Sequence, residues 1–341
     1  MSGPDSEIDA REPPIFWVGA AGFSPEQREL IEASLSQTAG LTDWRLCHFG
    51  EADAWLVNGA KCRVLPDGNI RVSPGPSSET FLDLDIRAAD RPVAFALPIA
   101  DTSLEPHCTF SVNSFTSVHA MLSKFEACLA FAHAQFVLGT EIVERGAALR
   151  HGVFHVSYRN KLLAVLDFWH GEVGLAPQLD PVEVDLAVWS KRPIGARGIP
   201  PGFVASTPAQ LAWNYARRCE ANLLPLRYLT RTIYYRRTPR VPVSWLGDSH
   251  LAILKELSQR SGTLSELAAR VGSATLALER DLTCLFFAGA ITTTESKAAS
   301  LATAPGLTPA RQPVLAEHAA AHHRERYDPT IPGRLNGRPR A

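Results

Sequence analysis

Residues 245–294, WLGDSHLAILKELSQRSGTLSELAARVGSATLALERDLTCLFFAGAITTT, carry the clearest fold signals in this chain. Apolar residues recur there at helical spacing in three short runs, and residues 290–294 read as a strand. Thr263 and Glu266 have the spacing of a capping box, which begins a helix, and Gly272 is placed to end it. The stretch therefore predicts three short helices followed by a strand.

The same periodicity predicts which side chains of these helices are buried. Leu251, Leu254 and Leu257 share one face of the first helix, and Ser273 is placed to cap the third helix. The inner face of the third helix is predicted to consist of Leu276, Leu282, Leu285 and Phe286.

The charges of this stretch are balanced. Its cations are Lys255, Arg260, Arg270 and Arg280, and its acids are Asp248, Glu256, Glu266, Glu279 and Asp281. Proteins that grip duplex DNA neutralise several phosphates, so a stretch close to neutral favours contact with protein. The order of elements resembles a winged-helix domain, which implies such a domain over residues 244–294. The resemblance also implies an alternative function, a DNA-binding transcription regulator that uses this domain.

Residues 217–240, RRCEANLLPLRYLTRTIYYRRTPR, precede this stretch and are rich in Arg and Tyr, with Glu220 as the only acid. Guanidinium groups pair bidentately with carboxylate and phosphate, and aromatic faces stack on bases or on Arg. We predict that the residues binding a ligand or partner are Arg227, Arg231, Tyr234, Tyr235, Arg236, Arg237 and Arg240. The alternative is that these arginines lie over apolar surface and pair with acids from other parts of the chain.

Arg236 and Arg240 are four residues apart, as are Arg227 and Arg231. This spacing resembles the Arg pair of the PilZ family, which implies a cyclic-dinucleotide effector as a further alternative. The second motif of that family, Asp/Asn-x-Ser-x-x-Gly, does not occur in the sequence.

Residues 151–243 are predicted to form a β-meander followed by an Arg/Tyr-rich helical block. The segments VFHVSY, LLAVLDF and EVGL read as consecutive strands, with turns at residues 159–161 and 170–171. Thr207 and Gln210 have the spacing of a capping box that begins a helix.

Residues 15–150 are predicted to form an open α/β sheet, because strand-like segments alternate there with helical ones. Ser24, Pro25 and Gln27 begin the first helix, and a hairpin turn lies at residues 66–69.

The order of elements in residues 15–150 resembles a response-regulator receiver domain. That family places an acidic pair after its first strand, where this chain has Gly19-Ala20-Ala21-Gly22, and an Asp at the end of its third strand, where this chain has Asn58. An amide accepts no phosphoryl group, and Asp53 lies at the other end of that strand. The resemblance therefore implies a pseudo-receiver that serves as a docking surface.

Other polar clusters read as structural. His151 and His155 are four apart on a predicted strand, about 13 Å from each other, too far to share a metal ion. Asp167, His170 and Glu172 read as a solvated hairpin turn, and tail residues His318, His322 and His323 as solvated side chains. We expect no catalytic residue, no metal site and no cofactor.

The bulk composition is that of a globular chain with two or three domains: 341 residues, 45% hydrophobic, 20% charged, net charge −1. Residues 1–14 lack the apolar core of a secretory signal, and no window is apolar enough for a membrane span. The scattered cysteines favour free thiols in a cytoplasmic protein. We expect a disordered lead over residues 1–14 and a disordered tail over residues 295–341.

Together these features predict an α/β plus α+β chain with a receiver-like sheet, a β-rich middle block and a C-terminal winged helix. The predicted function is that of a non-enzymatic signalling protein that binds a protein partner or anionic ligand through its Arg/Tyr-rich segment. The oligomeric state is not indicated by the sequence.

Overall fold

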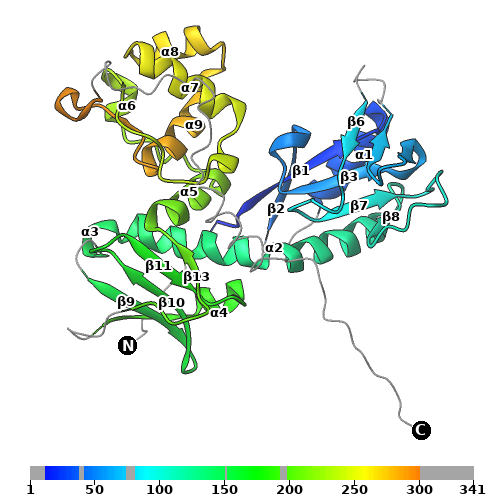
Figure 1. Ribbon diagram of the computed structural model, residues 1–341, viewed down its shortest axis with the longest axis horizontal. Helices are drawn as coiled ribbons and strands as arrows, with labels where there is room; N and C mark the ends of the chain where they lie inside the picture. The colour runs from blue at the N-terminus through cyan, green and yellow to red at the C-terminus, as the bar shows by residue number, and fades with distance from the viewer. Residues whose placement is uncertain (1–11, 38–41, 74–80, 150–151, 193–197, 300–341) are drawn as a thin grey trace, which may run out of the picture. The chain divides into compact units, whose positions relative to one another are not determined.

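The computed structural model of the protein describes residues 12–37, 42–73, 81–149, 152–192 and 198–299. A parallel sheet forms the first part, with its strands in the order β2-β1-β3-β7-β8 (Figure 1). Its strands are β1 (Ile15–Ala21), β2 (Asp43–Cys47), β3 (Ala54–Asn58), β7 (Val93–Ala96) and β8 (Thr109–Phe110). Antiparallel sheets follow later in the chain, so the predicted mixed α/β class is confirmed.

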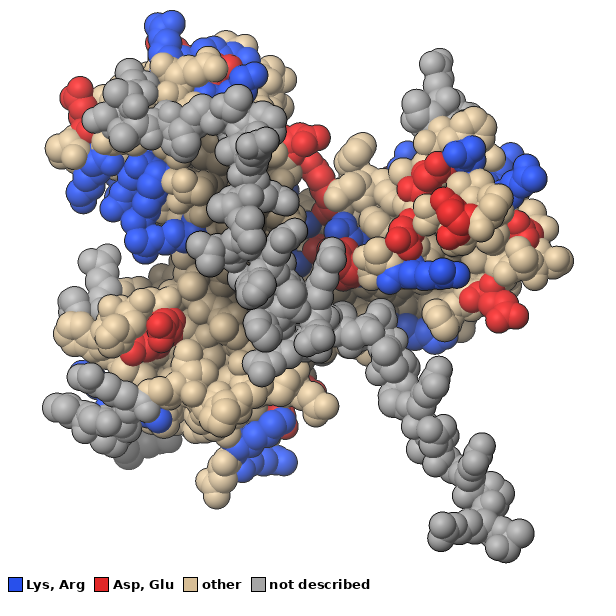
Figure 2. All heavy atoms as spheres, viewed as in Figure 1, with Lys and Arg blue, Asp and Glu red and all other residues tan. Residues whose placement is uncertain are grey.

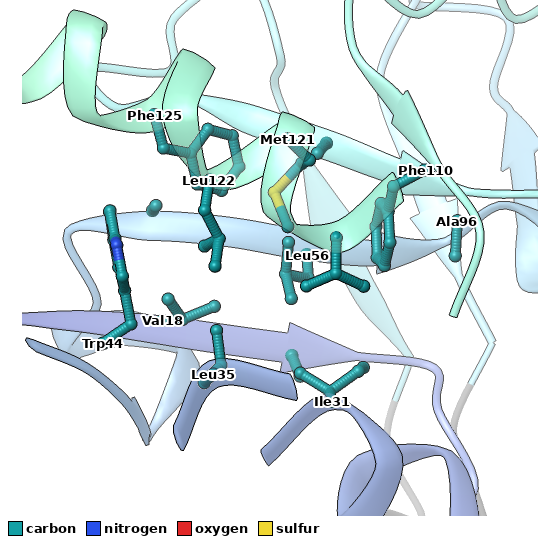
Figure 3. Close-up of a cluster of buried hydrophobic side chains, with 14 of the residues drawn as sticks. Val18, Ile31, Leu35, Trp44, Leu56, Ala96, Phe110, Met121, Leu122 and Phe125 are labelled. Carbon is teal, nitrogen blue, oxygen red and sulfur yellow. The ribbon is translucent and has the colours of Figure 1, made fainter. Parts of the chain in front are cut away.

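Two helices, α1 (Pro25–Ser36) and α2 (Phe115–Glu144), cover one face of the parallel sheet. Successive side chains of a strand point to opposite faces, so alternate strand residues meet these helices. Figure 3 shows Val18 and Leu56 from the strands lying against Met121 of α2 in this core. The start of α1 is as predicted: Gln27 N–H donates to Ser24 Oγ, and Ser24 N–H donates to Gln27 Oε1.

A small antiparallel sheet covers the other face of the parallel sheet. It consists of β4 (Cys62–Val64), β5 (Ile70–Val72) and β6 (Leu82–Leu84), and packs on Val57 and Phe95. The predicted hairpin is therefore confirmed, since β4 pairs with β5 antiparallel.

The second half of α2 packs on another antiparallel sheet, ordered β12-β9-β10-β11-β13. Its strands are β9 (Val153–Tyr158), β10 (Lys161–Asp167), β11 (Glu172–Leu175), β12 (Val188–Lys191) and β13 (Val204–Ser206). The predicted meander is confirmed as β9-β10-β11. Two short helices, α3 (Gly146–Leu149) and α4 (Pro181–Asp185), flank these strands in the sequence.

Helix α5 (Pro208–Arg218) crosses α2 at Gly139. A Cβ atom at Gly139 would lie 2.3 Å from the carbonyl oxygen of Leu211, so only glycine permits this approach. Leu138 of α2 shares a core with Leu211 and Tyr215 of α5. The long helix α2 thus contributes to the cores of both large sheets.

The third core lies around the last helices of the described chain. Its elements are α6 (Arg227–Thr230), β14 (Tyr234–Tyr235), α7 (Asp248–Gln259), α8 (Leu264–Val271), α9 (Thr275–Phe287) and β15 (Ile291–Thr292). β14 pairs with β15 antiparallel, and Ile233 forms a bridge with Gly262. Trp213 and Ala216 of α5 also belong to this core.

In residues 245–294, the predicted start and end of α8 are correct, whereas some predictions for α7 and α9 are wrong. Thr263 and Glu266 form the capping box, and Gly272 ends α8 with a positive φ of 73°. Leu251 and Leu276 were predicted to be buried, but they are 38% and 76% exposed. Ser273 does not cap α9, whose N-cap is Ala274 without a side-chain hydrogen bond.

The ends of the described chain make specific contacts. Glu12 Oε1 accepts a hydrogen bond from Glu220 N–H, and Ala299 N–H donates to the Tyr235 carbonyl. Of the predicted lead and tail, residues 12–14 and 295–299 are described, with a short 3-10 helix, η4, at Glu295–Lys297, and the other residues lie outside the described ranges. All described residues belong to one compact unit, residues 1–301, and the domain boundaries within it stay a prediction.

Two predictions about composition can be checked in this structure. The cysteines are free thiols, as expected, with Cys128 exposed and Cys62, Cys219 and Cys284 buried. Within the described ranges, no helix combines the length and the apolar character that a bilayer span requires.

Candidate arginine-rich binding site

The arginine-rich segment lies between α5 and α7. Residues 221–247 contain five Arg and no Asp or Glu. Leu224, Tyr228 and Ile233, each at most 5% exposed, anchor the segment in the third core. The arginines between these anchors are therefore carried on backbone that is held in place.

The loop at residues 236–240 wraps around the carboxyl end of α9. Arg236 N–H donates to the Ala290 carbonyl at 2.8 Å, and Arg240 N–H donates to the Ala288 carbonyl at 3.0 Å. The Arg237 side chain donates from Nε to the Gly289 carbonyl at 3.1 Å. These bonds fix three arginines on one turn of backbone.

The pKa of Arg237 reflects the charges that lie near it. Burial lowers the pKa of the Arg237 guanidinium, and the positive charges of Arg240 and Arg236 lower it further. No carboxylate contributes to this balance, so the loop carries a concentrated positive charge.

Arg227, earlier in the same segment, lies near the same end of α9. Its guanidinium carbon lies 5.4 Å from the centroid of the Tyr228 ring and 5.6 Å from that of Phe286, which is in the last turn of α9. Burial raises the pKa of the Tyr228 hydroxyl, and the nearby charges of Arg227 and Arg236 oppose that rise. The Arg227 guanidinium also hydrogen-bonds the Tyr228 hydroxyl, and a guanidinium has five N–H donors, so others remain for a planar anion.

We call Arg227, Arg236, Arg237 and Arg240 the arginine cluster. In the part of the chain that the structure describes, no ion pair joins any of them to an acidic side chain. Figure 2 shows a group of Lys and Arg side chains along the lower edge of the region that contains α6 to α9, and others at its upper edge. The arrangement can hold carboxylate or phosphate oxygens through several charge-assisted hydrogen bonds.

The other predicted site residues lie beside the cluster. Arg231 is exposed at the end of α6. Tyr234 and Tyr235 are half-buried in β14, and Tyr235 packs against the third core. A binding role for these residues stays a prediction, and the structure gives the two tyrosines a place in the sheet.

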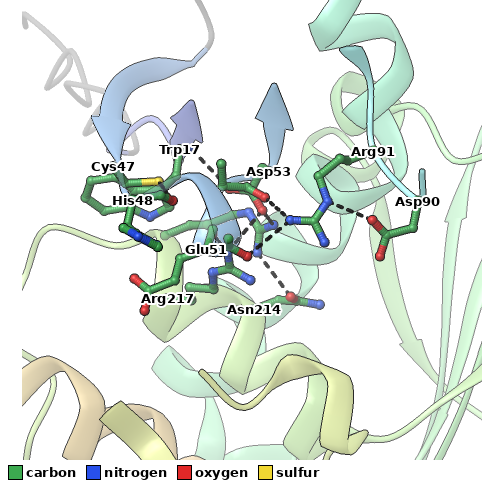
Figure 4. A network of polar contacts seen from close by, with 12 residues as sticks. Trp17, Cys47, His48, Glu51, Asp53, Asp90, Arg91, Asn214 and Arg217 are labelled. Atoms are coloured by element: carbon green, nitrogen blue, oxygen red, sulfur yellow. Dashed lines mark hydrogen bonds and ion pairs between the residues drawn. The ribbon is translucent and has the colours of Figure 1, made fainter. Parts of the chain in front are cut away.

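The first two arginines of the run, Arg217 and Arg218, have a different environment. Arg218 Nη2 lies 2.8 Å from Asp53 Oδ1, and the two side chains are only 5% and 7% exposed. Arg218 Nη1 also donates to Asn214 Oδ1, while Asp53 Oδ2 accepts from Trp17 N–H. Figure 4 shows Asn214 and Arg217 of α5 lying close to Asp53, which directly precedes β3.

The pairing of Arg218 ties α5 to the parallel sheet. Burial lowers the pKa of the Arg218 guanidinium, and the charge of Asp53 opposes this effect. Arg217 Nη2 donates to the Glu51 carbonyl at 2.6 Å and lies 3.5 Å from Asp53 Oδ1. The alternative prediction, internal pairing, therefore holds for these two arginines.

Sequence reasoning missed a buried titratable pair beside this junction. His250 Nε2 of α7 lies 3.4 Å from Asp281 Oδ1 of α9. Burial lowers the pKa of His250 to about 4, with Arg217 adding to the effect, and burial raises the pKa of Asp281 to about 6. The two residues are 31 positions apart, and no local signal in the sequence links them.

The carboxyl ends of β1 and β3 meet at Asn58, which is 6% exposed. Asn58 Nδ2 donates to the Gly22 carbonyl at 3.0 Å and to Gln27 Oε1 at 3.3 Å. Asn58 Oδ1 accepts from Ala60 N–H at 3.1 Å. The amide therefore joins β3 to the start of α1.

The remaining polar clusters have simple geometries. His170 Nδ1 lies 2.7 Å from Asp167 Oδ2 on a hairpin turn, and the His170 side chain is 64% exposed. His151, His318, His322 and His323 lie outside the described residues. In the described ranges, no group of His, Cys, Asp and Glu is placed to hold a metal ion.

Comparison with known proteins gives no relative for this chain. No protein-family model, curated protein or solved structure matches it. The assignment of a role therefore depends on the geometry of the arginine cluster and its surroundings.

Proposed function

We propose that this protein is a non-enzymatic regulatory protein that recognises an anionic partner through the arginine cluster. The supporting observation is that four arginines are fixed around the carboxyl end of α9 without an acidic partner among the described residues. Like charges held together raise the local positive potential, and an incoming anion relieves it.

Fixed side chains make this arrangement suitable for binding. Arg237 is held by the Gly289 carbonyl, and Arg227 by aromatic rings. A side chain that is already ordered loses less conformational entropy when a ligand binds. The cluster therefore combines charge with preorganisation.

The parallel sheet supports a pseudo-receiver role for residues 15–150 within this proposal. Counted within the sheet, its strand order is 2-1-3-4-5, the order of flavodoxin-like sheets that receivers share. The hydrogen-bonded amide of Asn58 stands at the end of the third strand. This combination favours a docking platform over a phosphorylated switch.

The environment of α9 favours a protein or small anionic partner over duplex DNA. In a DNA-binding winged helix the third helix enters the groove, whereas here α9 packs on Trp213 and Ala216 of α5. Arg280 of α9 lies over the Trp17 ring, 5.6 Å from its centroid. Weak binding of duplex DNA with a shallow salt dependence is expected.

The test compares wild type with Arg236→Ala/Arg240→Ala, which leaves the Arg237 hydrogen bond intact. Binding to fluorescent polyglutamate and to inorganic polyphosphate is measured by anisotropy in low salt. We expect the double variant to lose at least about tenfold in affinity for whichever polyanion binds more tightly.

The matched control is Arg63→Ala/Arg159→Ala, which removes the same charge from two exposed positions elsewhere. If both variants lost the same affinity, the effect would depend only on net charge, and the proposal would be refuted. Melting temperatures of both variants should equal that of wild type, which excludes unfolding as the cause.

A further inference from the structure

Exposed aliphatic side chains lie just before the first arginine of residues 221–247 and shortly after the last one. Leu226 is 78% exposed and immediately precedes Arg227, and Val243 is 74% exposed and lies three residues after Arg240. Among the large hydrophobic residues that the structure describes, Leu276 is similarly exposed at 76%, followed by Val188 at 66% and Trp169 at 65%.

Both aliphatic residues are fixed to the core by their neighbours. Leu226 lies between Leu224 and Tyr228, which are 5% and 2% exposed. Val243 begins the short helix η3 (Val243–Trp245), whose Trp245 packs against the third core. Leu226 and Val243 are therefore exposed on anchored backbone. An aliphatic side chain that is exposed on anchored backbone can contact a partner without rearrangement of the fold.

We infer that the anionic partner is a protein segment that carries both acidic and aliphatic side chains on one face. This inference rests on the proposed function and names its partner class. The segment 221–247 has no acid of its own, so the partner must supply the carboxylates. The partner's aliphatic residues cover Leu226 and Val243.

The shape of the cluster favours such a segment over other polyanions. A nucleic-acid backbone offers phosphates without aliphatic groups, which leaves Leu226 and Val243 uncovered. Arg237 is half-buried, and its Nε donates to the Gly289 carbonyl. An anionic group can therefore reach its guanidinium only if that group projects from the surface of the partner. Carboxylates on a peptide project in this way, whereas lipid headgroups form a broad surface.

The experiment uses the full chain and two fluorescent peptides that carry the same number of Glu residues. One is polyglutamate, and the other places Glu and Leu on one helical face. Wild type should bind the Glu/Leu peptide at least about tenfold more tightly, because burial of two aliphatic side chains adds to the charge contacts. Leu226→Ser/Val243→Ser should lose that advantage and keep its affinity for polyglutamate.

Leu276→Ser is the matched control, since this side chain is equally exposed but lies at the other end of α9, roughly 15 Å away along the helix. It should bind both peptides as wild type does. Arg236→Ala/Arg240→Ala should weaken the binding of both peptides.

The inference is overturned if wild type shows no preference for the Glu/Leu peptide or if Leu226→Ser/Val243→Ser retains it. It also falls if duplex DNA or phosphatidylserine vesicles bind more tightly than the peptide in a cluster-dependent way, an outcome that leaves the proposed function standing. Failure of Arg236→Ala/Arg240→Ala to alter binding of any probe removes the proposed function itself.

Discussion

The two halves of one arginine-rich run have opposite environments in this protein. Arg217 and Arg218 end α5 and contact Asp53, more than 160 residues earlier in the sequence, and the Arg218 and Asp53 side chains are buried there. Arg236, Arg237 and Arg240, about twenty residues later, surround the end of α9 without a carboxylate partner in the described chain. The same residue type therefore joins parts of the fold at one site and presents charge at the other.

The physical difference between the halves is desolvation. A buried charge needs a partner because removal from water costs several kcal/mol per ion, and Asp53 supplies one to Arg218. A surface charge remains hydrated and stays available to a ligand. Four tests measure this difference, in order of decreasing expected effect.

Arg218→Ala is expected to destabilise the fold by about 3–5 kcal/mol, because it leaves the buried Asp53 carboxylate with only the longer, 3.5 Å contact to Arg217. Chemical denaturation gives the free energy of unfolding. Arg218→Met combined with Asp53→Asn should recover much of the loss, since the Asn oxygen can still accept from Trp17 N–H. A cost below about 1 kcal/mol for Arg218→Ala would contradict the buried pair.

Asp281→Asn is expected to stabilise the fold by about 2–3 kcal/mol at pH 7. The pKa of Asp281 is raised to about 6 in the folded protein, against 3.8 in a model compound, so the carboxyl contributes stability at low pH that is lost as pH rises through 6. The gain from the substitution should therefore disappear near pH 4. Denaturation curves from pH 4 to 7 measure it.

His250 faces Asp281 and Arg217, and its own linkage has the opposite sign. Its pKa is lowered to about 4, so its contribution to stability is present above pH 6.5 and is lost as pH falls toward 4. In wild type the two contributions oppose each other between pH 4 and 6. Asp281→Asn should consequently lose stability on acidification more steeply than wild type, and parallel pH profiles would contradict this account.

Arg237→Ala is expected to cost about 1 kcal/mol, because it removes the hydrogen bond to Gly289 and a cation at the carboxyl end of α9. Thermal denaturation beside Arg236→Ala, which removes a neighbouring charge but no side-chain hydrogen bond shown here, separates the two effects. Identical melting temperatures for Arg237→Ala and Arg236→Ala would show that the hydrogen bond of Arg237 does not stabilise the fold.

Arg236→Ala/Arg240→Ala is expected to change the free energy of unfolding by less than about 0.5 kcal/mol. These side chains repel one another and Arg237, so their removal costs no ion pair. A loss above about 1 kcal/mol would show that they stabilise the fold and would blur the distinction between the two halves of the run.

Local rules were sufficient where the signal and its effect lie within one turn or hairpin. The capping boxes at Ser24 and Thr263, the left-handed Gly272 and the pairing of β4 with β5 all follow from neighbouring residues. The periodicity of α9 was correct for Leu282 and Leu285. It failed for Leu276, which lies two residues before the fully buried Leu278 and therefore on nearly the opposite face of α9.

The candidate site shows the same division. The sequence identified the arginines and their lack of acidic neighbours, and it left open whether they pair within the fold. It could not reveal that Phe286 and Gly289 bring Arg227 and Arg237 to one end of α9, since those contacts span 52 residues or more.

The sequence by itself determined the helices and hairpins with strong local signals, the mixed α/β class and the position of the arginine-rich segment. Tertiary structure alone decided which arginines are buried with a carboxylate and which remain in water. The reason is that helix capping and periodicity act over a few residues, whereas desolvation and ion pairing depend on which distant segments the fold brings together.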